Sequence, residues 1–565
     1  MGIVKKPGFM SGRGDEDEGV LAEQGYKQEL NRSWGLLQNF GVSFSIIVSS
    51  SSDAYACPME LELELELELE RKPSLPASGR QLSVITGITT LFEYGLVTGG
   101  PAVMSIGWII VATFTFIVGL GMAEVTSAHP TSGGPYFWAA MLAPTAHSAA
   151  FYSWITGWFN LLGQVAVTTG ITFGCANLIA TLASVKGGFT PTPGSIIGIY
   201  AALLVSHGLV NTFGVRMLKY LNNTSIFLHS VGVSAFAIAV VASAPTHRSA
   251  REVFGNFYDG TGDPGWSSRA SPAYVACVGC LMSQYTITGF DASAHLSEET
   301  RKAQWSAPLG VLTSIFCSAL FGFFLLLCLL FSIQDFDGTI NSEVGQPVLQ
   351  ILLDIFSEDA AIVLFTLVII CVWHCGLFSL TSNSRMYFAF ARDRGIPKFF
   401  AHVDDKFQSP IRTIWLGVFL SFCLALPSLG STVAFSAATS IATIGLYISY
   451  GIPILVGLVY PSNFHKGPFN LGMASRPVAA IGVLWICFIT IVFCLPQLNP
   501  VDSQSLNYTP VAVGIVAAGA FGSWFWAKSW YVGPIRQIEA EAHGVNVEEP
   551  GALEKLEEEK TKGST

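Results

Sequence analysis

Two stretches of the sequence place glycine and threonine inside long apolar surroundings: VITGITTLFEYG at 84–95 and YTITGFDASAHLSEE at 285–299. Both contain Ile-Thr-Gly, at 85–87 and 287–289. A helix that unwinds at such a point frees backbone N–H groups, which suit a carboxylate, and C=O groups, which suit an ammonium group. The same residues would also suit close helix packing without any break. The residues that could form such a site are Thr86, Gly87, Thr89, Thr90, Gly95, Thr286, Thr288, Gly289 and Asp291.

Three ionisable residues lie inside apolar runs and are candidates for binding a proton or a charged group. His229 can change its charge near neutral pH and could carry a proton, or it could be a neutral histidine bonded to a neighbouring helix. For Asp291 we favour capping of a resumed helix over direct contact with an amine. Glu93 could bind a proton or a cationic group, or it could weaken the site. No metal-ligand or nucleophile–base motif accompanies them, so we expect neither a metal, nor another cofactor, nor an enzyme.

The composition is that of a polytopic membrane protein. Of the 565 residues, 51% are hydrophobic and 12% are charged, whereas soluble domains carry about 25% charged residues. Apolar runs close to the length of a membrane-spanning helix, about 20 residues, predict an all-α protein with twelve transmembrane helices. We expect a twelve-helix domain over 36–532 between an N-terminal tail, 1–35, and an acidic C-terminal tail, 533–565. The predicted spans are 36–47 joined with 82–97, then 104–123, 148–182, 193–213, 223–244, 272–294, 307–332, 348–384, 411–428, 431–459, 477–496 and 509–531.

The distribution of lysine and arginine predicts the orientation of these spans. With an internal N-terminus, twelve lysine and arginine residues fall in the inner loops and four in the outer loops. Positive charge favours the cytoplasmic side of a membrane. Both termini are therefore expected in the cytosol. No region is basic enough to indicate a nucleic acid partner.

The first predicted span is interrupted by MELELELELELERK at 59–72, in which leucine alternates with six glutamates. Alternation of this kind suits an amphipathic strand, but a lone strand cannot satisfy its backbone in lipid. A translated insert must therefore loop into water. If residues 48–81 are removed, the flanks join as NFGVSFSII and LSVITGITTLFEYG, which form one continuous span.

We interpret residues 48–81 as a non-native insert, a retained in-frame intron. Val48-Ser49 can be encoded by a sequence that matches a splice donor, and Gln81 can be encoded by CAG, which ends like a splice acceptor. A repeated Leu-Glu dipeptide is what a hexanucleotide repeat would encode. The alternative is a genuine low-complexity loop that regulates or disables the protein.

Four longer motifs resemble those of amino acid–polyamine–choline permeases. EVTSAHPTSGGPYFW at 124–138 resembles the motif after their second span, and SRMYFAFARDRGIPKFF at 384–400 the end of their eighth. TGFDASAHLSEET at 288–300 and SIATIGLYISYGIPI at 440–454 resemble the sixth and tenth spans of the fungal branch, which carries GABA, other amino acids and choline. The sequence departs from the family pattern at Glu93, where glycine is expected.

The resemblance implies a five-plus-five inverted-repeat fold with broken helices 1 and 6. It implies that Thr86, Gly87 and Ile88 offer N–H groups to a substrate carboxylate, that backbone groups near 286–289 take the amine, and that Phe290 closes over the substrate. Asn160 and Gln164 could face the same cavity, or they could only bond to neighbouring helices.

The implied function is import of an amino acid or GABA by a secondary active transporter of the plasma membrane, coupled to protons. The expected partners are that small molecule, protons and the lipid bilayer. The alternatives are a choline or polyamine permease, whose substrates lack a carboxylate, and a nutrient sensor that does not transport. The short tails give little room for a signalling region.

The intron interpretation predicts the composition of the mature transcript. Sequencing of transcripts across codons 40–90 is expected to yield spliced reads in which the codons for NFGVSFSII precede those for LSVITGITT. Reads that all retain the insert would contradict the interpretation and leave the regulatory loop.

Overall fold

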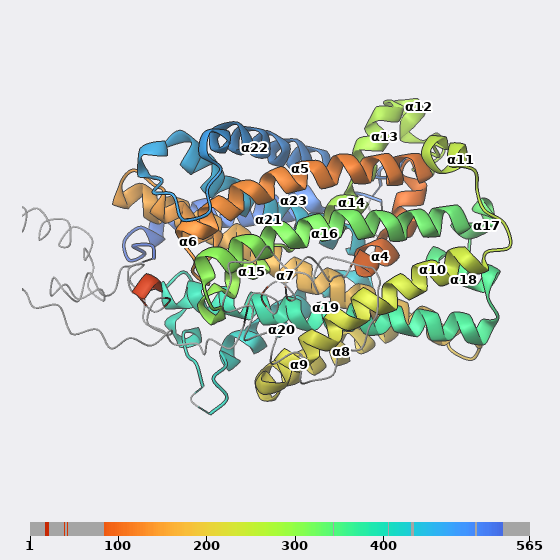
Figure 1. Cartoon of the computed structure of the whole chain (residues 1–565), viewed down its shortest axis with the longest axis horizontal. Helices are drawn as coiled ribbons and strands as arrows, with labels where there is room; N and C mark the ends of the chain where they lie inside the picture. Colours follow the sequence, from red (N-terminus) through yellow and green to blue (C-terminus); the bar gives the residue numbers. More distant parts are fainter. Residues whose placement is uncertain are drawn as a thin grey trace, which may run out of the picture.

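The computed structural model describes residues 17, 19–21, 35, 39, 42, 84–342, 344–404, 406–430, 434–502 and 505–534. Over these residues the chain forms helices and isolated bridges but no β-strand. The helices run side by side along the longest axis of the molecule (Figure 1). The all-α class predicted from the sequence is therefore confirmed. The predicted insert, 48–81, and nearly all of both predicted tails lie outside the described residues.

Nine helices within the described ranges are long and apolar enough to cross a membrane. Two shorter apolar helices, Ile85–Val97 and Val233–Ser243, accompany them. The structure thus has the architecture of a polytopic membrane protein, and the count of twelve spans stays a prediction. The nine helices are α5 (Gly100–Ala128), α7 (Ala146–Val185), α8 (Pro193–Phe213), α16 (Ala303–Ser332), α19 (Glu358–Arg392), α20 (Ile411–Ala425, continued by the 3-10 turn η4, Leu426–Leu429), α21 (Ala434–Val459), α22 (Ser475–Val492) and α23 (Thr509–Ala527).

Three of the predicted spans contain irregular backbone. The first is represented by α4 (Val84–Val97) and, from the segment 36–47, by the buried residues Asn39 and Val42. The span predicted at 223–244 consists of α9 (Val215–Phe227), the π-helical turn η1 (Leu228–Gly232) and α10 (Val233–Ser243). The span predicted at 272–294 consists of α13 (Pro272–Gly279), α14 (Leu281–Thr286) and α15 (Ala292–His295), followed by the 3-10 turn η2 (Ser297–Glu299).

The single span predicted at 348–384 is wrong in its extent. The structure forms α18 (Pro347–Ile355) and then α19, with Phe356 and Ser357 in extended conformation between them. Glu358 and Asp359 occupy the first turn of α19, where acidic side chains are stabilised by the positive end of the helix dipole. The predicted span runs across Ser357, Glu358 and Asp359, which mark this helix start in the sequence.

The two ends of the bundle carry different short elements. One end, called here the α6 end, holds α6 (Pro135–Met141) and α15 (Figure 1). The other end holds α11 (Ala250–Gly255), α12 (Trp266–Arg269) and α17 (Phe336–Ile340). Ser249 caps α11, and its hydrogen bonds to Glu252 hold the pKa of that carboxyl below its usual value.

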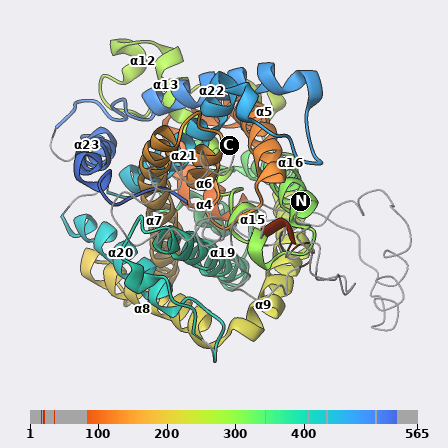
Figure 2. The same ribbon diagram turned by 90° about the vertical axis from the view of Figure 1, so that its left-hand side faces the viewer.

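The helices α7, α19 and α21 lie inside the bundle, and α8, α9, α22 and α23 lie around it (Figure 2). Of the most apolar 18 consecutive residues of α7, 78% are buried inside the protein, compared with only 17% for α23. The backbones of α7 and α21 meet directly, because a Cβ atom on Gly445 would lie 3.0 Å from Cα of Gly163. This interior pair supports the site described next.

Candidate functional site

Gly87 of α4 lies directly against Thr286, the last residue of α14. A Cβ atom on Gly87 would lie 2.8 Å from both Cα and Cβ of Thr286, which is closer than side chains can pack. The side chains of Thr86, Ile88 and Thr89 beside it are buried. The two Ile-Thr-Gly segments, far apart in the sequence, are thus brought together, and only glycine permits this approach.

The helix α4 is kinked at Leu91, whose backbone angles, φ −114° and ψ 15°, are not helical. The carbonyl oxygen of Thr89 accepts a hydrogen bond from Nε2 of Gln346, the N-cap residue of α18, at 2.7 Å. Thr90 Oγ1 donates to the carbonyl oxygen of Thr86 at 2.8 Å. Side chains therefore satisfy backbone groups around the kink, as an apolar environment requires.

The backbone is not helical at 287–291, between α14 and α15. Gly289 has φ +101°, a conformation that favours glycine. The hydroxyl groups of Thr286 and Thr288 each donate to a carbonyl oxygen one turn earlier, at 2.6 Å. The buried N–H group of Gly289 donates no hydrogen bond to any residue that the structure describes. This N–H group is suited to an acceptor on a ligand.

Asp291 precedes α15, but its side chain makes no capping hydrogen bond, so the predicted capping role is wrong. Its Oδ2 atom instead accepts a hydrogen bond from Nε2 of Gln164 at 2.7 Å and lies 3.2 Å from Nε2 of His295. The Asp291 carboxylate therefore contacts these two side chains and not the N–H groups of α15, which is only four residues long. Asp291 is 1% exposed and His295 is fully buried.

Asn160 and Gln164 lie one turn apart on α7, and both are buried. The backbone carbonyl of Gln164 accepts a hydrogen bond from Nδ2 of Asn383 on α19 at 2.7 Å. The amide of Asn160 has no hydrogen-bond partner for its oxygen or its nitrogen among the described residues. A buried unsatisfied polar group costs about 1–3 kcal/mol, so this amide is suited to a polar ligand.

Phe290 is fully buried next to the interruption of helix. Its ring packs against Tyr450 and Tyr447 of α21, with centroids 5.2 and 6.2 Å away. The Tyr447 hydroxyl is in turn bonded to Gln284 of α14 at 2.5 Å. Phe290 therefore joins the interrupted helix to α21, and its role as a gate stays a prediction.

Of the two predicted proton-coupling residues, His229 lies on another element and Glu93 lies on α4, two residues beyond its kink. His229 is fully buried in η1, and its Nδ1 atom lies 2.7 Å from the carbonyl oxygen of Ser225. This contact lies within the run α9–η1 and decides between neither role, so the proton-coupling role of His229 stays a prediction. Glu93 lies beyond the Leu91 kink, and its side chain is exposed.

Buried ion pairs hold the α6 end of the site together. Glu298 of η2 accepts two hydrogen bonds from the guanidinium of Arg392, at 3.0 and 3.1 Å, and one from the N–H of Ser132 at 3.0 Å. Glu299 accepts from Nε of Arg385 at 2.8 Å. Both acids and Arg385 are at most 5% exposed. The two α19 arginines thus fix the segment that follows α15.

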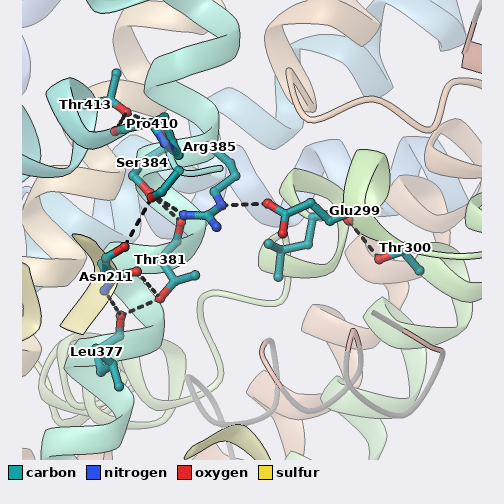
Figure 3. A network of polar contacts seen from close by, with 11 residues as sticks. Asn211, Glu299, Thr300, Leu377, Thr381, Ser384, Arg385, Pro410 and Thr413 are labelled. Carbon is teal, nitrogen blue, oxygen red and sulfur yellow. Dashed lines mark hydrogen bonds and ion pairs between the residues drawn. The ribbon is translucent and has the colours of Figure 1, made fainter. Parts of the chain in front are cut away.

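Figure 3 shows how the Arg385–Glu299 pair is built into its surroundings. Arg385 also donates to the hydroxyl of Ser384 at 3.1 Å. Thr300, which directly follows η2, accepts from Nδ2 of Asn39 at 2.5 Å. Asn39 Nδ2 donates as well to the carbonyl of Ser293 in α15 at 3.1 Å. The segment predicted as the first half of span one therefore contributes to the same cluster.

Sequence reasoning missed His295 and the two arginines. Asp291 and His295 stand four residues apart in DASAH, a spacing that places side chains together on a helix. That signal becomes visible only once the helix is known to resume at Ala292. The arginines were counted only as cytosolic charges, because nothing local in SRMYFAFARDRG predicts their burial.

The chain matches the sequence profile of the family described as "Amino acid permease" over residues 77–535. It therefore belongs to the amino acid permease family, whose members are transporters and not enzymes.

Relatives from plants and yeast match nearly the whole chain. The "Amino-acid permease BAT1 homolog" of Oryza sativa subsp. japonica is 39% identical over 545 residues, which cover 94% of this chain and 97% of that protein. "Amino-acid permease BAT1" of Arabidopsis thaliana is 38% identical over 93% of this chain and 97% of its own length. The "GABA-specific permease" of Saccharomyces cerevisiae is 30% identical over 92% of this chain and 86% of that protein.

Removal of Arg385 is expected to destabilise the fold, because it leaves the buried Glu299 carboxylate without its guanidinium. Arg385→Met should cost about 3–5 kcal/mol of unfolding free energy, measured as loss of thermal stability in detergent. The double variant Arg385→Met/Glu299→Leu should recover part of this loss. The control is Lys186→Met, which breaks an exposed pair with Asp359 and should leave the thermal stability nearly unchanged, because solvent screens such pairs. Equal losses in the two single variants would contradict the prediction.

Proposed function

We propose that this permease imports an amino acid or GABA across the plasma membrane by alternating access, coupled to protons. The observation that most supports this proposal is the contact of Gly87 with Thr286 beside the non-helical segment 287–291. It puts two irregular backbone segments and their polar groups side by side inside an apolar bundle, as in carriers whose interrupted helices line the substrate site. The family and the GABA-specific yeast relative support this substrate class.

The substrate would lie between α4 and the segment 287–291. Its carboxylate would meet N–H groups of Thr86, Gly87 and Ile88, and its amine would meet backbone carbonyls near 286–289. The Asn160 amide, which has no partner in the described structure, would bond to the polar end of the substrate. Phe290 would close over it.

The fold proposed for this function is the twelve-helix, five-plus-five inverted repeat. Three irregular spans would complete the nine regular ones: α4 with the segment around Asn39, the run α9–η1–α10, and the run α13–α14–α15. We place both termini in the cytosol, so that the α6 end faces inward. Residues 48–81 are proposed to be absent from the working carrier.

A choline or polyamine substrate is the second candidate. Such substrates carry no carboxylate, so N–H groups around Gly87 would have no anionic partner. Exposed Glu93, which stands where the family has glycine, is the observation in favour of a cationic substrate.

The carrier proposal is tested by uptake of labelled GABA into cells that lack their own permeases, expressing a form without residues 48–81. Unlabelled amino acids, choline and spermidine compete at two pH values. We expect saturable uptake that only amino acids reduce and that is faster at acid pH. Inhibition by choline or spermidine alone would favour the second candidate. No uptake of any of these compounds, with protein at the cell surface, would favour the nutrient sensor.

The site itself is tested by adding one carbon atom. Gly87→Ala forces a Cβ atom against Thr286, so uptake should be lost while protein at the surface persists. Gly519→Ala on α23 is the matched control, because a Cβ atom there meets nothing within 4 Å. Full uptake by Gly87→Ala would exclude a substrate site that depends on this contact.

A further inference from the structure

A cavity at the edge of the bundle lies apart from the proposed substrate site. It has a volume of about 650 Å³ and lies between the N-terminal part of α7, the end of α23 and the loop that follows α19. The helix α23 packs against α7 on the outside of the bundle (Figure 2). We call this space the α7–α23 cavity. Its lining includes Trp526, whose side chain is 75% exposed, so the cavity is open to the surroundings of the bundle.

Four tryptophans line the α7–α23 cavity: Trp154 and Trp158 of α7, Trp526 of α23 and Trp530 just after it. The buried Trp154 ring meets the rings of Trp158 and Trp530 edge-on, with centroids 5.7 Å away in each case. Nε1 of Trp154 donates to the carbonyl oxygen of Ala520 at 3.1 Å. Nε1 of Trp158 is buried and has no hydrogen-bond partner among the described residues. An indole N–H group can only donate, so Trp158 is suited to an oxygen atom of a ligand in the cavity.

Arg394, which also lines the cavity, has an unusual backbone conformation. Its φ of +64° lies in the left-handed region, which is disfavoured for residues other than glycine. The N–H groups of Arg394 and Gly395 donate to carbonyl oxygens of Ala391 and Phe390, at 3.0 and 2.7 Å, and these bonds close the end of α19. They involve the backbone alone, so glycine, the usual residue at such a helix end, would form them with less strain. An arginine at this position points to a role for its side chain.

Charge decides which class of ligand the cavity suits. An aromatic cage alone would suit a quaternary ammonium group. Here Arg394 and Lys398 stand among the tryptophans, and the described residues that line the cavity include no aspartate or glutamate. Two positive charges repel a cation and attract an anion, so the cavity suits a negatively charged ligand with oxygen acceptors.

The position of the cavity identifies the source of that anion. The outer face of α23 next to Trp526 exposes the rings of Phe521 and Phe525, as a helix in contact with lipid does. Tryptophan is enriched where a membrane meets water, and basic pockets between spans bind lipid head groups. An acyl chain could therefore lie along α23 while a phosphate group enters the cavity.

We propose that the α7–α23 cavity binds the phosphate group of an anionic phospholipid. Arg394 and Lys398 balance its charge, Trp158 donates a hydrogen bond to one of its oxygen atoms, and the acyl chains extend along α23. A lipid held in this way ties the end of α19 to α7 and α23. Its assignment to the inner leaflet rests on the proposed orientation with the α6 end inward, whereas its binding rests on neither the substrate nor proton coupling.

The test measures lipid bound to the purified permease in detergent, by native mass spectrometry at increasing lipid concentration. The probes are dioleoyl phosphatidylserine, which is anionic, and dioleoyl phosphatidylcholine, which has the same acyl chains and no net charge. We expect phosphatidylserine to bind more tightly than phosphatidylcholine. Glycerophosphoserine, which is the same head group without acyl chains, should not displace it.

The charge of the cavity is tested with Arg394→Gly/Lys398→Gln, in which glycine suits the backbone at position 394. This variant should bind phosphatidylserine about 25-fold more weakly than wild type, at about fivefold for each charge removed. The matched control is Lys219→Gln, which removes an exposed charge on α9 outside the cavity and should leave the binding unchanged.

Two further variants test the tryptophans. Trp158→Phe keeps an aromatic ring and removes only the N–H donor, so it should also weaken the binding. Trp526→Ala changes an exposed side chain and carries the test if the charge variant does not fold; it should weaken the binding as well. Its matched control is Trp305→Ala, at an exposed tryptophan of α16 outside the cavity, which should bind as wild type does.

Equal binding of phosphatidylserine and phosphatidylcholine by wild type would overturn the proposal. So would wild-type binding of phosphatidylserine in both the charge variant and Trp526→Ala. Displacement by glycerophosphoserine would overturn the lipid in favour of a soluble phosphate ester. Binding that appears only after removal of the acidic tail, 535–565, would overturn it in favour of that tail as the occupant.

Discussion

The structure depends on one constraint: every backbone N–H and C=O group inside a bundle that faces lipid must find a partner within the protein. Regular helices meet it automatically, whereas the kink at Leu91 and the segment 287–291 do not. There the hydroxyls of Thr286 and Thr288 and the amide of Gln346 donate hydrogen bonds to backbone carbonyl oxygens. Two groups that they leave unsatisfied among the described residues, at Gly289 and Asn160, are those that we propose for the substrate.

The same segment is anchored at the α6 end of the bundle by charge. Burial of a lone carboxylate costs several kcal/mol or more, so Glu298 and Glu299 are tolerated only because α19 presents an arginine to each. These pairs hold η2 while α15, only four residues long, contributes little helical stability of its own. The buried residues Asp291 and His295 stand at the two ends of this short helix.

Much of this arrangement could be predicted from the sequence. Apolar run lengths predict the helical bundle, and the repeated Ile-Thr-Gly predicts that α4 and the segment 287–291 belong together, because glycine is the residue that lets two backbones touch. The role of Asp291 was predicted wrongly, since the choice between a cap and a distant amide depends on where α7 places Gln164. The α18–α19 boundary was missed because the apolar residues on both sides were joined into one run across Ser357, Glu358 and Asp359. The partners of Arg385 and Arg392 lie about 90 positions away, beyond any local pattern.

The crossing of α7 and α21 at Gly163 and Gly445 has a mechanical consequence. Where two helices are separated by side chains, rotamer changes let one slide over the other. Here backbone atoms are in contact and no such layer exists, so relative sliding would drive atoms into each other. The two helices therefore resist relative sliding at this contact. Under the alternating access proposed above, the movement would fall to the helices packed around this pair.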